Sequence, residues 1–142
     1  QLKKYDVGKG EQIPLLQEVV EAVNQRAVLN IELKAAGTPG PVAQLLKEYI
    51  TQKNADPKKF LISSFDHFLV KEFQQYAPEI PTAIIFEGNP IKRAQMATDA
   101  GAQTAVLQYK WISPEFIKDA HARGIKVYGY TVNDAQTAHT LQ

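Results

Sequence analysis

Hydrophobic positions along this chain follow two spacings, one helical and one typical of buried strands. Apolar residues three to four positions apart, such as Leu16, Val20 and Val23, predict a helix over residues 12–26. Elsewhere the apolar residues form short, mostly continuous runs, which are typical of strands covered on both faces in a parallel sheet. We predict strands at residues 27–34, 60–64, 82–86, 104–109 and 125–132.

Helices are predicted between these strands, at residues 42–54, 66–76, 90–101 and 114–124, with a further one starting at residue 133. Local signals mark their ends. Asp66 is placed to cap one helix, and Asn89 followed by Pro90 predicts an N-cap and a first helical residue. Gly101 and Gly124 are natural left-handed stops.

Alternation of strands and helices predicts an α/β fold. An open doubly wound sheet and a TIM (β/α)8-type barrel compete. The last three strands start about 22 residues apart, and no glycine-rich phosphate loop follows a strand; both observations favour the barrel. A complete barrel needs about 250 residues. We therefore expect residues 1–142 to be a single partial domain of about five β/α units, with two unpaired sheet edges, cut from a longer protein.

Composition and charge exclude several classes of function but do not identify one. Apolar residues make up 44% of the 142 residues, which supports a globular core. Sixteen basic residues nearly balance fifteen acidic ones and no basic stripe stands out, so we expect no nucleic-acid partner. No apolar run is long enough for a stable membrane insertion. The absence of cysteine excludes disulfides and a cysteine nucleophile.

Glu32 and Lys34 are the strongest candidates for chemistry, because a barrel keeps its active site at the carboxyl ends of its strands. They are two residues apart in a strand and so share a face, while Leu33 points toward the helices. A carboxylate offers a hard ligand to a divalent metal, and an ammonium neutralises an anionic substrate. A structural ion pair inside the barrel is the alternative.

The other strand ends carry weaker signals. We expect Asp66 to cap a helix rather than to touch a ligand. Tyr130 is placed to wall a pocket, with Asn133 as a helix cap. Ser63 and Ser64 could contact a ligand, or they could simply fill a tight layer of the barrel. Glu87 and Tyr109 lie at strand ends, where polar residues are expected at the boundary with solvent.

None of the three histidines falls at a strand end, and no paired-histidine metal motif is present. We expect surface or helix-packing roles for His67, His121 and His139. The sequence thus predicts the metal and phosphate side of a site without an acid–base pair.

Four motifs in order resemble the glycerophosphodiester phosphodiesterase family: Gly10 to Val19 (GEQIPLLQEV), Asn30 to Lys34 (NIELK), Ile62 to Asp66 (ISSFD), and Ala120 to Gly124 (AHARG) with Tyr130 to Asn133 (YTVN). The resemblance implies a TIM-barrel enzyme that uses Mg²⁺ or Ca²⁺ to hydrolyse glycerophosphodiesters, small molecules such as glycerophosphocholine, to glycerol 3-phosphate and an alcohol. It leaves the compartment open, since members occur in both cytoplasm and periplasm, and it leaves the oligomeric state open.

Residue by residue, the resemblance implies that Glu32 binds the metal, that Lys34 is a catalytic residue facing the phosphate, and that Phe65 contacts substrate. Tyr130 stands where the family usually has tryptophan, so the pocket keeps an aromatic wall of different shape. The family's HRG, E-x-D and HD motifs and its last strand are not found in residues 1–142. The chain would therefore correspond to the third to seventh strands, and we expect the segment alone to be inactive.

Two other functions remain open. The barrel could be a lyase or aldolase in which Lys34 forms a Schiff base. It could also be a non-catalytic module that binds a phosphate ligand.

Overall fold

A computed structural model of the chain describes residues 2–141. Its centre is a five-stranded sheet in which every neighbouring pair is parallel and the spatial order equals the sequence order. This confirms the predicted α/β class. The strands are β1 (Leu29–Glu32), β2 (Phe60–Ser64), β3 (Thr82–Phe86), β4 (Thr104–Gln108) and β5 (Lys126–Tyr130).

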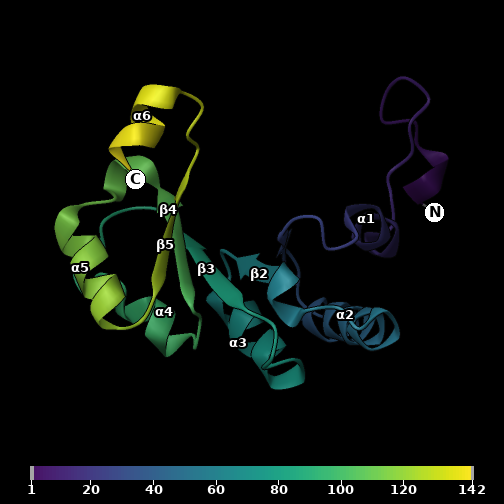
Figure 1. Cartoon of the computed structure of the whole chain (residues 1–142), viewed down its shortest axis with the longest axis horizontal. Helices are drawn as coiled ribbons and strands as arrows, with labels where there is room; N and C mark the ends of the chain where they lie inside the picture. The colour runs from purple at the N-terminus through teal and green to yellow at the C-terminus, as the bar shows by residue number, and fades with distance from the viewer. Residues whose placement is uncertain (1, 142) are drawn as a thin grey trace.

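Helices alternate with the strands, and α2 to α5 lie on the outer side of the curved sheet (Figure 1). Three short 3₁₀ helices complete the described chain. The helices are α1 (Leu16–Val23), α2 (Pro39–Lys53), α3 (His67–Tyr76), α4 (Gln95–Asp99), α5 (Pro114–Ala122) and α6 (Ala135–Thr140), and the 3₁₀ helices are Leu2–Lys4, Pro57–Lys59 and Tyr109–Trp111.

Two predicted helices are shorter than the hydrophobic spacing suggested. Helix α1 begins at Leu16 rather than at residue 12, because the Glu18 carboxylate accepts the Leu15 N–H at 2.8 Å and fixes the start there. Helix α4 covers only five residues, and the prediction that Pro90 is its first residue was wrong. The chain instead turns before it, with Arg93 at φ 47°, a left-handed conformation that no continuous helix allows.

The predicted helix boundaries are otherwise mostly confirmed. Asp66 caps α3 by accepting the Phe68 N–H, and Gly101 and Gly124 have φ of 71° and 72°. The last helix is capped by Asp134, whose side chain accepts the Thr137 N–H at 2.8 Å. The prediction that Asn133 is this cap was wrong by one residue.

The hydrophobic core lies between the outer face of the sheet and the helices. One cluster joins β1 and β2 to α2 and α3 around Phe73, and a second joins β3 and β4 to α4 and α5 around Phe116. Both rings are fully buried. Truncating a buried phenylalanine to alanine costs about 3–5 kcal/mol, so each ring is a large share of a domain's stability.

The outermost strands are less covered than the central ones. Every residue of β2 and β3 is buried, whereas β1 and β5 contain only partly covered and exposed positions. Full burial of the strands is therefore confirmed only for the middle of the sheet. No helix within residues 2–141 is both long and apolar enough to cross a membrane.

Candidate functional site

The carboxyl ends of the five parallel strands meet at one edge of the sheet, and alternate side chains there face its inner, helix-free side. Ile62, Ile84 and Leu107 belong to the helix-facing core. Residues of the opposite parity therefore point inward. At this edge they are Glu32, Lys34, Ser63, Phe65, Glu87, Gln108 and Tyr130.

Glu32 and Lys34 form an ion pair, with Lys34 Nζ 3.6 Å from Glu32 Oε2. Leu33 between them is 3% exposed and joins the core, which confirms the predicted alternation. The Lys34 side chain is 76% exposed and that of Glu32 32%. An exposed pair at this distance adds little stability, so both groups are accessible to a ligand at low cost.

Ser63 lies beside Glu32 in the paired register of β1 and β2. Its side chain faces inward, and its buried hydroxyl has no hydrogen-bond partner within the described chain. The neighbouring Ser64 faces the helices. It donates to the Leu33 carbonyl at 2.7 Å and accepts the Asp66 N–H at 3.0 Å.

Phe65 and Tyr130 meet across the inner face of the sheet. Their ring centroids are 6.5 Å apart with an interplanar angle of 80°. In a flat sheet, strands as far apart as β2 and β5 would be separated by three strand spacings, about 14 Å. The sheet therefore curls around this edge, as a barrel wall does (Figure 1), and it brings together two residues that were predicted separately to contact substrate.

Glu87 and Gln108 add a second polar pair from adjacent strands. Gln108 Nε2 donates to Glu87 Oε1 at 2.8 Å. The Tyr130 hydroxyl donates to the carbonyl of Phe86, the residue before Glu87, at 3.4 Å. Partial burial, and then the charges of Glu87 and Glu32, raise the pKa of the Tyr130 hydroxyl above its usual value, so it stays protonated at neutral pH.

From the sequence, Glu87 was only a weak candidate at a strand end. Gln108 was not predicted, and its neighbour Tyr109 was expected at the end of that strand instead. Tyr109 begins a short 3₁₀ helix and is exposed. The two-residue alternation from Val106 would have identified Gln108 as the inward-facing residue.

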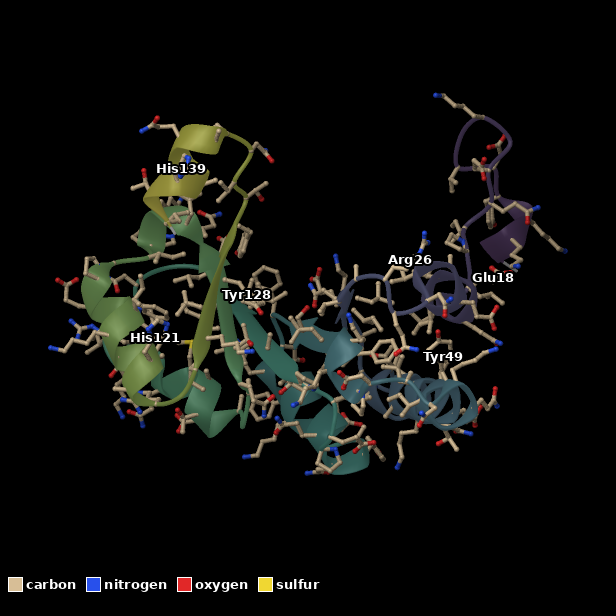
Figure 2. All side chains as sticks on the ribbon, in the orientation of Figure 1. Glu18, Arg26, Tyr49, His121, Tyr128 and His139 are labelled. Carbon is tan, nitrogen blue, oxygen red and sulfur yellow. The ribbon has the colours of Figure 1, made fainter. Side chains whose placement is uncertain are left out.

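The histidines occupy the positions expected of them. His67 Nε2 lies 3.0 Å from the Ile85 carbonyl, where the ring ties the start of α3 to β3. His121 on α5 and His139 on α6 are exposed and lie away from the inner face, onto which Tyr128 projects (Figure 2).

A divalent metal would find one suitable ligand here. Glu32 offers a hard carboxylate oxygen at the edge, which is the donor type that Mg²⁺ and Ca²⁺ take. Within residues 2–141 no cluster of three metal-ligating side chains forms. Glu32 therefore fits such a site as one ligand among others, with water and phosphate oxygens able to occupy further positions.

A family model described as "Glycerophosphoryl diester phosphodiesterase family" matches residues 1–142. No curated protein matched.

Solved structures match over almost the whole chain. A Galdieria sulphuraria protein assigned to the glycerophosphodiester phosphodiesterases superposes with a TM-score of 0.79 at 20% identity, covering 99% of this chain and 60% of that one. A glycerophosphodiester phosphodiesterase from Parabacteroides distasonis gives 0.77 at 20% identity, with the same coverages of 99% and 60%.

An Oleispira antarctica phosphodiesterase in complex with the product sn-glycerol-3-phosphate gives a TM-score of 0.77 at 25% identity, covering 94% of this chain and 55% of that one. The chain thus spans 55–60% of the length of these three structures. Their barrel architecture agrees with the curled sheet described above.

Proposed function

The chain belongs to the glycerophosphoryl diester phosphodiesterase family, and we propose that it supplies the third to seventh strands of a barrel enzyme that hydrolyses glycerophosphodiesters. Water would replace the alcohol at phosphorus, releasing that alcohol and glycerol 3-phosphate. The observation that carries the proposal is the Glu32–Lys34 pair, accessible on the inner side of the carboxyl edge. The Oleispira antarctica relative, bound to sn-glycerol-3-phosphate, supports the product half of the reaction.

Lys34 is the residue that we propose for transition-state stabilisation. Attack on a phosphodiester builds negative charge on the oxygens around phosphorus, and a fixed ammonium is most favourable when that charge is largest. The ammonium lies at the edge of the sheet, next to the Glu32 carboxylate. Because the Lys34 side chain is 76% exposed, it can reach a bound phosphate without losing packing.

Glu32 is proposed as one ligand of Mg²⁺ or Ca²⁺. When bound, such a cation neutralises phosphate charge and polarises the phosphoryl oxygens. Phe65 and Tyr130 would contact the substrate as an aromatic wall, since their rings already meet on the inner face. The general acid and base would come from outside residues 1–142, because the His67 ring is engaged by the Ile85 carbonyl and His121 and His139 lie away from the inner face.

A Schiff-base lyase is less well supported. An amine nucleophile is activated by removal from water or by a second cation. The Lys34 side chain is instead exposed and paired with a carboxylate. Borohydride reduction in the presence of a carbonyl substrate separates the two mechanisms, because a phosphodiesterase leaves no reducible adduct.

The decisive experiment measures glycerol 3-phosphate released from glycerophosphocholine by the full-length enzyme, with Mg²⁺, with Ca²⁺ and with a chelator. We expect metal-dependent release that is lost in Lys34→Met. Lys126→Met is the matched control, because Lys126 is an exposed lysine at the opposite end of the sheet, where β5 begins. A folded full-length protein that binds glycerol 3-phosphate but releases none from any diester would instead identify a non-catalytic binding module.

A further inference from the structure

Glu87 is the one acidic side chain on the inner face of this edge that the proposed phosphate chemistry does not use. It follows β3, between the strand that ends near Phe65 and the strand that carries Gln108. Its carboxylate is held at 2.8 Å by the Gln108 amide. The hydrogen bond fixes the position of the negative charge but does not neutralise it.

The charge of Glu87 distinguishes it from Glu32. Glu32 is paired with Lys34, whereas no lysine, arginine or histidine within residues 2–141 forms an ion pair with Glu87. An uncompensated carboxylate repels the phosphate of a diester. The same carboxylate attracts a positively charged group carried elsewhere on the substrate.

The aromatic pair lies beside this carboxylate. Tyr130 is linked to the backbone next to Glu87 through its hydrogen bond to the Phe86 carbonyl at 3.4 Å, and the Phe65 ring stands edge-on to the Tyr130 ring. Phe65 is 52% exposed, which leaves much of its ring open to a ligand. The faces of such rings attract ammonium groups, and quaternary ammonium ligands are recognised by clustered aromatic rings.

We propose that Phe65, Tyr130 and Glu87 form a subsite for a positively charged alcohol, so that Glu87 determines a preference for glycerophosphodiesters whose alcohol carries an ammonium group. The phosphate would lie toward Glu32 and Lys34, and the ammonium would lie against the rings and near the carboxylate. This inference rests on the proposed function and adds the class of leaving alcohol to it.

The test compares kcat/KM of the full-length enzyme for glycerophosphocholine and for glycerophosphoglycerol, whose alcohol is neutral. We expect the wild type to prefer the cationic substrate. Glu87→Gln keeps the shape and the Gln108 contact but removes the charge. It should lower kcat/KM for glycerophosphocholine about tenfold, mainly through KM, and change that for glycerophosphoglycerol less than about twofold.

Two further variants are compared with Glu87→Gln, one inside the proposed subsite and one outside it. Phe65→Leu should lower the same preference while its apolar volume is nearly kept. Glu79→Gln, an exposed carboxylate in the loop before β3, should leave the preference unchanged. Equal losses for both substrates in Glu87→Gln, or a wild type without preference, would overturn the subsite.

A binding measurement tests the subsite even if the protein hydrolyses no diester. Calorimetry would compare choline with 3,3-dimethylbutan-1-ol, which has the same shape without the charge. Tighter binding of choline that disappears in Glu87→Gln supports the subsite independently of catalysis, so that absence of activity would then count against the proposed function alone. Equal binding of the two alcohols would overturn the subsite.

Discussion

Ser63 and Ser64 are neighbours in β2 and equally buried, yet only the Ser64 hydroxyl is hydrogen-bonded within the described chain. Ser64 faces the helices and links the backbone of Leu33 to that of Asp66. Ser63 faces the inner side of the sheet, next to Glu32 in the strand register. The two side chains have the same chemistry, so they provide a matched comparison between a structural hydroxyl and one that is free for a ligand.

The first prediction uses this pair in the full-length protein. Ser64→Ala should lower the free energy of unfolding by about 1–3 kcal/mol, because the buried Leu33 carbonyl loses its donor. Ser63→Ala should leave it within about 0.5 kcal/mol, since no partner is lost. Urea denaturation measures both. Equal destabilisation by the two substitutions would contradict the distinction.

The second prediction concerns Glu32. Glu32→Gln keeps the side-chain shape but removes the charge that we propose to bind metal. The apparent affinity for Mg²⁺ or Ca²⁺ should fall, and excess metal should restore part of the activity. A metal titration of the initial rate measures this. An unchanged metal dependence would show that the pair with Lys34 is only a structural contact.

The third prediction separates Lys34 from Glu32. Lys34→Met keeps the aliphatic stem, and kcat should fall about 10²- to 10³-fold, as it does on loss of one preorganised donor. KM should change little if the ammonium acts only in the transition state. Steady-state kinetics measures the split, and thermal melts control for folding. A rise in KM at constant kcat would assign Lys34 to ground-state binding instead.

The fourth prediction concerns the contact between α4 and α5. Asp119 accepts two hydrogen bonds from Arg123, at 3.0 and 3.2 Å, and one from the Ala94 N–H at 3.1 Å. The Arg123 hydrogen bond, followed by that of Ala94, lowers the pKa of Asp119 below its usual 3.8. The stabilising contribution is therefore complete above pH 3.8 and is lost as the pH falls through the lowered value.

Asp119→Asn should accordingly be less stable than the wild type at pH 7, and the difference should shrink as the pH falls below about 3.8. Denaturant unfolding at several pH values measures it. Glu79→Gln is the control, because that carboxylate is exposed in a loop. A difference that grows in acid would contradict the assigned sign.

The fifth prediction concerns residues 1–142 expressed alone. Strands β1 and β5 each have one hydrogen-bonded neighbour in the described sheet, and exposed strand edges pair with other chains. We expect dimers, aggregates or a molten state, and no release of glycerol 3-phosphate. Sedimentation and thermal melts decide the first point. A monomer that unfolds cooperatively would show that the segment is a self-sufficient domain.

The strands were more predictable than some of the helices. Strands β2 and β3 match their predicted bounds, because each contains a short continuous apolar run, which is typical of a strand buried on both faces. Helix α4 was overestimated because Asn89 and Pro90 form a helix-start signal that also suits a turn. The turn forms here because Arg93 has a left-handed backbone conformation, which its residue type does not predict.

The candidate site was likewise predictable only in part. The shared face of Glu32 and Lys34 follows from strand periodicity and was predicted. The contact between Phe65 and Tyr130 depends on how strongly the sheet curls, and the pairing of Glu87 with Gln108 depends on the register of β3 and β4. Neither curvature nor register can be deduced from one strand at a time.

The strands lie in the sheet in the same order as in the sequence, and this order affects how the sheet can form during synthesis on the ribosome. Each strand after β1 emerges when its neighbour has already left the exit tunnel, so pairing can proceed from the N-terminus without waiting for distant sequence. Paired residues of neighbouring strands lie only 20 to 31 positions apart along the chain, which keeps the entropy cost of each loop closure small. The edge that carries Glu32, Glu87 and Tyr130 would then be assembled one residue at a time, in the order in which the chain is translated.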